Sequence, residues 1–458
     1  MRSRRSLAIV IASLGLLSGC EEIESIPGAL GFSAQDICAR VFVGGESGWK
    51  AKHKFAAPFV EPLPLIWHVD IDYNRKKVKV SESLTWQKAV AAYRPGLGCT
   101  KLVDLSRSEL LAQPFTPTTP PALGPDYWPR GNGGVSPAAA NYDQAALSIA
   151  FNDLMNERDY NTQGIAMAHN GKMIRKAYGS GYSDASRFTG WSMSKTVTAL
   201  ALGIAQQRVG GFTLDDSASK FYPSWQGTPK EAITVRHILN MESGLQWEEE
   251  YGSASTTADL YYGSHDMAAY VASLPQEFTP GTHFEYSSGD TMLLSGIVKQ
   301  LSGGSLQSNY DFLNNYLLQP VGITSAVMQP DESGTTVGAA HNYMSLEDWL
   351  RIGQLILNRG EWQGQQVVPA AWIDEIAKRT PNSGGSYGGQ VWTYSADPMA
   401  EYGIPEDIIL LWGYQHQLMA VIPSRNLVFL RLGVFTGNED EEQARGYFKA
   451  LQRVLQTL

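Results

Sequence analysis

The chain has 458 residues, of which 43% are hydrophobic and 18% are charged, a composition typical of a globular protein with a large core. Its formal net charge of −9 argues against a nucleic-acid partner, because such binders need clusters of Lys and Arg. Eight histidines are scattered without metal-binding spacing, so neither a metal nor another cofactor is expected.

The first twenty residues have the pattern of an export signal. Three arginines precede an apolar stretch from Leu7 to Leu17 that is too short for a membrane span. The stretch ends in Leu-Ser-Gly-Cys, which resembles the lipobox of bacterial lipoproteins, so Cys20 is expected to carry lipid after removal of a signal peptide at 1–19. This predicts an anchored protein on the periplasmic side of the cell envelope, and Glu21 favours the outer membrane. A plain signal peptide is the alternative.

A tether at 20–33 and a small β unit at 34–110 are predicted to follow. Strand-like runs occupy 39–45, 64–73, 76–84 and 88–95 of this unit. Cys38 and Cys99 are an even pair in an exported chain, which suggests a disulfide; two free buried thiols are the alternative.

A proline- and glycine-rich linker at 111–140 then leads into a large domain at 141–458. Strands are expected near its start, where Asn170-Gly171 forms a hairpin turn, and near its end at 416–424 and 427–435. Helices are expected at 143–157, from residue 192 onward, and at 233–242, 291–301, 345–358, 369–377 and 441–458. We predict an α+β fold in which helices cover an antiparallel sheet made from the first and last strands.

The pattern Ser-x-x-Lys occurs three times in the chain, and its context separates the three sites. Ser47 lies in a glycine-rich turn and Ser217 follows two aspartates typical of a helix cap, so both are predicted to be structural. Ser192 begins a helix that is apolar on nearly every side and therefore buried. The helix dipole would favour an oxyanion there, burial would lower the pKa of Lys195, and the two side chains share one helix face. An activated nucleophile is one interpretation; a capping serine beside a snorkelling lysine is the other.

Four further segments extend the pattern around Ser192. Residues 210–225, 233–249, 284–306 and 346–368 follow in an order and spacing that resemble the serine β-lactamase and penicillin-binding-protein superfamily. The most similar group is the class C-like branch, with family VIII carboxylesterases and 6-aminohexanoate-dimer hydrolases. The resemblance covers residues 141–458 and implies an antiparallel sheet flanked by helices plus an all-helical subdomain.

By its position in the family's Ser-x-x-Lys motif, Ser192 matches the nucleophile that forms an acyl-enzyme, and Lys195 matches the lysine of that motif. Tyr286 matches a tyrosine that relays protons to and from the serine and the leaving group; a structural tyrosine is the alternative. A phenol has an ordinary pKa near 10 and needs positive neighbours, and Lys195 would be one. Ser288 stands where the family has an asparagine that offers an amide donor to the substrate.

The third family motif, Lys-Thr-Gly, falls on residues 412–417. Tyr414 takes the place of the lysine and His416 that of the glycine. The backbone N–H of Gln417 is expected to form the oxyanion hole with the N–H of Ser192. His416 would be a substrate-facing polar group, a local base or a packed surface histidine. Without the motif lysine and asparagine, hydrolysis of an ester or small amide fits better than hydrolysis of a β-lactam.

The expected function is that of an exported serine hydrolase acting on a small-molecule ester or amide. Aromatic residues would favour an apolar acyl or linear amide substrate, although each alone also suits a core position: Trp191, Trp247, Tyr261, Tyr262, Trp392 and Trp412. A catalytically degenerate cell-envelope binding protein on the same scaffold is the alternative. An α/β-hydrolase with its nucleophile at Ser386, in Gly-Gly-Ser-Tyr-Gly, is disfavoured because a loop rather than a strand precedes that serine.

Overall fold

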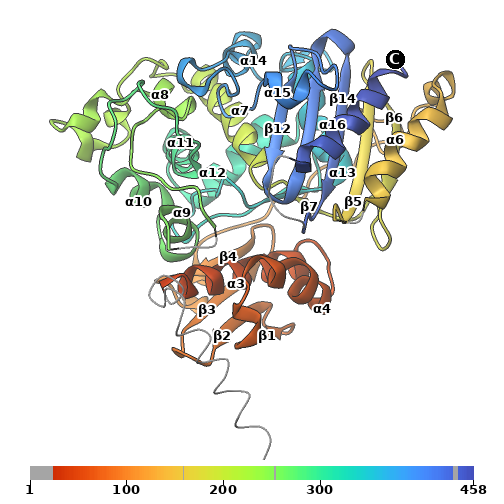
Figure 1. The fold of residues 1–458 in the computed structure, drawn as a ribbon. Helices are drawn as coiled ribbons and strands as arrows, with labels where there is room; N and C mark the ends of the chain where they lie inside the picture. The colour runs from red at the N-terminus through yellow and green to blue at the C-terminus, as the bar shows by residue number, and fades with distance from the viewer. Residues whose placement is uncertain (1–23, 158, 252–253, 437–441) are drawn as a thin grey trace, which may run out of the picture.

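The structure is a computed structural model that describes residues 24–157, 159–251, 254–436 and 442–458. A small N-terminal unit packs beneath a larger α+β domain (Figure 1). The predicted signal peptide at 1–19 and the lipidation site Cys20 lie outside the described residues. Within the described ranges, no helix is both long enough and apolar enough to cross a membrane.

The N-terminal unit packs a long helix against a four-stranded antiparallel sheet whose strands follow in chain order. Three of the four predicted strand-like runs are confirmed as strands, and the fourth strand of the sheet, β4, was not predicted. The elements are α3 (Ile26–Phe42), α4 (Gly48–Lys50), β1 (Trp67–Asp72), β2 (Lys77–Glu82), β3 (Lys88–Arg94), β4 (Gly98–Leu102) and α5 (Arg107–Ala112).

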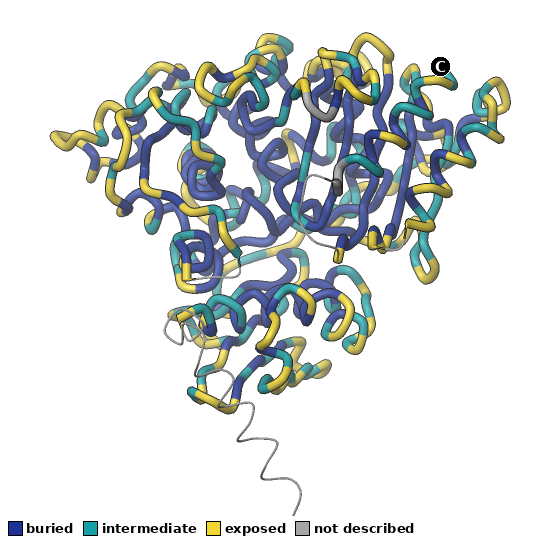
Figure 2. The backbone as a smooth tube through the Cα atoms, viewed as in Figure 1, coloured by how far each residue is buried: buried dark blue, intermediate teal, exposed yellow. Residues whose placement is uncertain are grey.

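Helix α3 corrects two predictions. The run 39–45 was expected to be a strand and residues 20–33 a tether, but residues 26–42 form one continuous helix. Every residue from Leu30 to Arg40 is buried, because α3 lies between the sheet of the N-terminal unit and the large domain (Figure 2). A helix covered on all sides shows no polar face, so its sequence carries no clear helical period.

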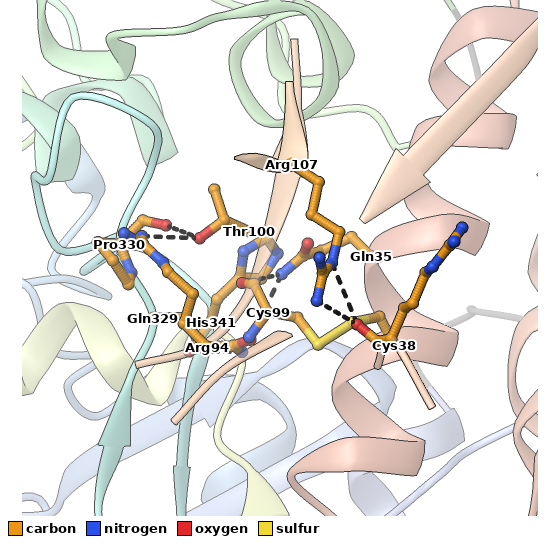
Figure 3. The surroundings of a disulfide bond; sticks show 10 residues. Gln35, Cys38, Arg94, Cys99, Thr100, Arg107, Gln329, Pro330 and His341 are labelled. Atoms are coloured by element: carbon orange, nitrogen blue, oxygen red, sulfur yellow. Dashed lines mark hydrogen bonds between the residues drawn. A yellow bond between two sulfur atoms is a disulfide. The ribbon is translucent and has the colours of Figure 1, made fainter. Parts of the chain in front are cut away.

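The predicted disulfide between Cys38 and Cys99 is confirmed, and it joins α3 to β4 (Figure 3). The two cysteines are 61 residues apart, so the cross-link removes much freedom from the unfolded chain. We expect Cys38→Ala/Cys99→Ala to lower the free energy of unfolding by about 4 kcal/mol. Denaturant unfolding of the oxidised wild type and the double variant checks this. An unchanged midpoint would show that the bond contributes nothing to stability.

The large domain is built on a five-stranded antiparallel sheet in the order β12-β13-β14-β5-β6, formed from the first and last strands as predicted. Its strands are β5 (Thr162–His169), β6 (Lys172–Tyr178), β12 (Ile409–Gly413), β13 (Gln417–Ile422) and β14 (Leu427–Gly433). Helices α6 (Gln144–Asn156) and α16 (Glu442–Leu455) pack together with one face of the sheet. Helix α13 (Leu346–Leu357) covers the opposite face.

A mostly helical region lies beside strand β12 (Figure 1). Its helices are α7 (Met193–Arg208), α8 (Val235–Leu239), α9 (Thr256–Ala258), α10 (Met267–Ser273), α11 (Ser288–Leu301), α12 (Leu306–Leu313) and α14 (Ala370–Ala377). The short helix α15 (Ala396–Met399) instead places Met399 in the core that the sheet shares with α6 and α16. Short strands complete the fold: β7 (Phe188–Thr189), β8 (Val327–Met328), β9 (Asn342–Met344), β10 (Glu361–Trp362) and β11 (Gln365–Gln366). Helix α7 contacts both β12 and α11, so its N-terminus lies where sheet and helices meet.

Candidate active site

Ser192 differs from the other two serines of the Ser-x-x-Lys pattern in what its hydroxyl does. Ser47 and Ser217 are structural, as predicted, and both serve as helix caps whose hydroxyls accept a backbone N–H. Ser192 occupies the N-cap position of α7, but its side chain makes no capping hydrogen bond, which contradicts the capping interpretation. Its side chain is instead in hydrogen-bond reach of Lys195, and the residue is 8% exposed.

Lys195 is fully buried, and its Nζ has three acceptors. It lies 3.1 Å from Ser192 Oγ, 2.8 Å from Ser288 Oγ and 3.1 Å from the carbonyl oxygen of Ala339. Burial lowers the pKa of Lys195 to about 8, although the carboxylate of Glu249 acts in the opposite direction. Both protonation states of this lysine are therefore accessible near neutral pH.

Tyr286 completes the group, because its hydroxyl interacts with the Ser192 side chain, an interaction that acts to lower the pKa of the phenol. The Nζ of Lys195 lies 5.0 Å from the centre of the Tyr286 ring. Burial, followed by the negative charge of Glu249, raises the pKa of Tyr286 above its ordinary value. The expectation that Lys195 would act as a positive neighbour and lower this pKa is therefore not met, and the phenol stays protonated at neutral pH.

Glu249 is a polar residue of the site that sequence analysis missed. Its carboxylate accepts hydrogen bonds from both the N–H and the hydroxyl of Ser288, from Trp247 Nε1 at 2.7 Å and from the Tyr251 hydroxyl at 2.9 Å. Ser288 thus links Lys195 to a carboxylate instead of presenting a free donor. Three consecutive glutamates precede Tyr251, and nothing in the sequence distinguishes the one that faces inward.

We expect Glu249→Gln to move the pH dependence of Ser192 acylation to lower pH. Removing a negative charge disfavours protonated Lys195, so its pKa should fall further below about 8 and the neutral base should form at lower pH. Acylation rates measured from pH 5 to 10 check this, with the exposed neighbour Glu248→Gln as the control. A rising limb that stays in place or moves to higher pH would contradict the role of Glu249.

The third motif lies at the end of β12, the strand of the main sheet that faces α7. A Cβ on Gly413 would lie 2.1 Å from the carbonyl oxygen of Gly190, so only glycine allows this approach to the segment before Ser192. In the turn that follows, Gln415 and His416 have φ values of 57° and 60°, the left-handed region that favours glycine. His416, at the position of the family glycine, therefore has a backbone conformation that favours glycine.

The three motif side chains take different positions. The ring of Tyr414 stacks on Tyr251 with 4.9 Å between ring centres. His416 is packed, but in the interior and not on the surface, with its ring 4.4 Å from that of Phe435. The Gln417 side chain exchanges hydrogen bonds with the backbone of Gly433.

Strand geometry also decides which backbone N–H faces α7. Leu410 exchanges both of its backbone hydrogen bonds with Trp392, on the side of β12 away from β13. Backbone groups alternate in direction along a strand, so Trp412, two residues later, directs its N–H to that same side. Gln417 is the partner of Gly413 in the β12–β13 ladder, so its N–H is directed toward β12.

Comparison with known proteins identifies the family. Residues 149–453 match the family model described as Beta-lactamase. The chain belongs to the Beta-lactamase family. This agrees with the predicted resemblance and excludes the α/β-hydrolase alternative. Ser386 lies in a turn, where its hydroxyl donates to the carbonyl oxygen of Ser383 at 2.8 Å.

The relatives within and near this family include hydrolases of several kinds. The chain is 23% identical to a D-aminopeptidase of Brucella anthropi over 226 residues, which is 46% of this chain and 41% of that protein. It is 20% identical to a 6-aminohexanoate-dimer hydrolase of Paenarthrobacter ureafaciens over 227 residues, or 47% of this chain and 57% of that one. The chain thus spans about half the length of these curated relatives.

A solved structure of a family VIII carboxylesterase supports the fold. It aligns with a TM-score of 0.56 at 14% identity, covering 71% of this chain and 99% of the esterase. At that identity the likeness shows a shared fold alone. The predicted α+β architecture of the Beta-lactamase family is confirmed by it and by the family match.

Proposed function

We propose that the protein is a serine hydrolase that cleaves an ester or small amide through an acyl-enzyme on Ser192. The observation that carries this proposal is the position of the Ser192 hydroxyl. It lies at a helix N-terminus without making a capping hydrogen bond, and it is 3.1 Å from the buried Nζ of Lys195. An activated nucleophile needs such a neighbouring base and a favourable field for developing negative charge. The hydrolase names of its relatives agree with this reaction class.

In this mechanism Lys195 and Tyr286 divide the proton transfers. Neutral Lys195 takes the Ser192 proton as Oγ attacks the carbonyl carbon of the substrate, because its pKa of about 8 suits a base near neutral pH. Tyr286, whose pKa is raised, keeps its proton and donates it to the leaving oxygen or nitrogen as that bond breaks. The proton on Lys195 then restores Tyr286, and water attacks the acyl-enzyme by the reverse sequence of transfers.

The oxyanion of the tetrahedral intermediate needs two N–H donors. One is the N–H of Ser192 at the start of α7. For the second, strand geometry supports Trp412 in place of the predicted Gln417, because the N–H of Trp412 is directed to the α7 side of β12 and that of Gln417 is directed toward β12 itself.

The surroundings of Ser192 support an uncharged, partly apolar substrate. Tyr414 stands where the family motif has a lysine, and aromatic rings of Trp191 and Tyr251 pack against it. Such rings suit an apolar acyl group or linear amide better than the carboxylate of a β-lactam antibiotic. We further propose that the enzyme is exported and anchored by lipid on Cys20, and Glu21 favours the outer membrane.

A catalytically degenerate binding protein is the second candidate. It is favoured by one observation, the replacement of both polar motif residues, since Ser288 bonds to Glu249 and Tyr414 packs among aromatic rings. Such a protein would keep the fold and an ordered site without forming an acyl-enzyme.

Covalent labelling with a fluorophosphonate distinguishes the two candidates. Intact mass should show one adduct on the wild type and none on Ser192→Ala, with Ser386→Ala labelled like the wild type as the matched control. Turnover of a short p-nitrophenyl ester should disappear in Ser192→Ala and persist in Ser386→Ala. A folded wild type that forms no adduct at Ser192 would support the binding protein and refute the hydrolase.

A further inference from the structure

The N-terminal unit lies outside residues 149–453 that match the family, yet its helix α3 packs directly beside the candidate active site. We propose that α3 contributes to that site through two positioning residues: Phe32 holds Trp191, which directly precedes Ser192, and Arg40 holds Gln415 in the turn after β12. This inference rests on the proposed hydrolase function. It assigns a role to a unit in which sequence analysis found no chemistry.

Trp191 and Gln415 are the two positions that need such support. Trp191 directly precedes the nucleophile and has a φ of 46°, and Gln415 lies in the turn after β12 with a φ of 57°. Residues other than glycine adopt this left-handed conformation at a cost in free energy, and they persist in it only where surrounding contacts hold them. Both residues are buried, so these contacts come from packed side chains.

The contacts from α3 reach both positions. The ring of Phe32 stacks on that of Trp191, with 6.1 Å between centres and 10° between planes. The guanidinium of Arg40 donates from Nη2 to Gln415 Oε1 at 2.8 Å, and the same oxygen accepts from Trp191 Nε1 at 3.3 Å. A single side-chain oxygen therefore joins α3, the turn after β12 and the residue before the nucleophile.

Helix α3 is itself held firmly in place. Arg40 forms an ion pair with Asp36 at 2.7 Å, one turn earlier on the same helix. Cys38, between them, is bonded to Cys99, and the N–H of Cys99 donates to Gln329 Oε1 of the large domain at 2.6 Å (Figure 3). The position of the Arg40 guanidinium is thus fixed relative to both units, as a positioning residue requires.

The test uses the left-handed conformation of Gln415. If Arg40 acts by holding that backbone, Arg40→Met should slow acylation of Ser192 by fluorophosphonate about 10- to 100-fold, since a displacement of about 1 Å at a reacting group has an effect of this size. Gln415→Gly in the Arg40→Met background should restore most of the rate, because glycine adopts a positive φ without support. Phe32→Leu, a milder change that leaves the Arg40–Asp36 ion pair intact, should also slow acylation.

The matched control is Thr100→Val. Thr100 donates to the carbonyl oxygen of Pro330 at 3.0 Å, so this variant weakens the same interface without touching Trp191 or Gln415. Its acylation rate should stay near that of the wild type. Rescue by Gln415→Gly together with an unaffected Thr100→Val supports the inference.

Three results overturn the inference, and only the last of them also removes the proposed function. Wild-type acylation rates in both Arg40→Met and Phe32→Leu, or a loss that Gln415→Gly does not restore and Thr100→Val shares, would make α3 a packing element and leave the hydrolase intact. Absence of any label on wild-type Ser192 would remove the proposed function and this inference with it. Should Arg40→Met fail to fold, Phe32→Leu tests the contact with Trp191 by itself, and a wild-type acylation rate in that variant would overturn the inference.

Discussion

Lys195→Met is expected to slow acylation of Ser192 by about 100- to 10,000-fold, the range for loss of a positioned general base. The protein should lose little stability, because methionine has a similar volume and the loss of three hydrogen bonds is offset by removal of an amine that is costly to bury. In the wild type, burial lowers the pKa of Lys195 to about 8, so acylation should rise as the pH passes through about 8 and the lysine loses its proton.

The measurement is the pH dependence of the fluorophosphonate labelling rate, combined with thermal unfolding. Lys220→Met, at the exposed lysine of another Ser-x-x-Lys pattern, is the matched control and should behave as the wild type. A variant that loses stability but labels at the wild-type rate would assign Lys195 a structural role and require another base.

Gly413→Ala is expected to affect both stability and activity. Its Cβ would lie 2.1 Å from the carbonyl oxygen of Gly190, a backbone atom that cannot rotate away, so β12 and the segment before Ser192 must separate. Overpacking of this kind costs about 1–3 kcal/mol of folding free energy. The displaced Trp412 N–H and Ser192 hydroxyl should also slow acylation by up to about 100-fold.

Denaturant unfolding and labelling kinetics measure these two effects separately. Gly124→Ala is the control, since a Cβ there meets no atom within 4 Å and the residue has no positive φ. An alanine at 413 that leaves both quantities unchanged would show that β12 does not position the nucleophile.

Most of the large domain was predictable because its elements carry local signals. Short stretches of sequence predict three of these elements: the apolar period of α6, the Asn170-Gly171 turn and the apolar helix after Ser192. Helix α3 was not predictable in this way, because burial on both sides removes its polar face and because its cover comes from residues far along the chain. The three residues Ser192, Lys195 and Tyr286 were found because their motifs are local.

The parts of the site that escaped prediction depend on contacts between distant segments. The register of the β12–β13 hairpin decides whether Trp412 or Gln417 directs its N–H to α7, and one residue of slip reverses the answer. Glu249 looks like its neighbours in sequence and differs only in the side chains that fold over it. Likewise, no local sequence pattern predicts that Gln415 and His416 adopt the left-handed backbone conformation that favours glycine.

The early start of α3 would also limit the distance between a lipid-anchored form of the protein and its membrane. A tether over 20–33 would allow a span of about 50 Å from a lipidated Cys20 to the first folded residue. Because the helix begins at Ile26, the largest possible distance from Cys20 to the first folded residue falls to about 20 Å. A lipid-anchored form would therefore hold its N-terminal unit close against the headgroups.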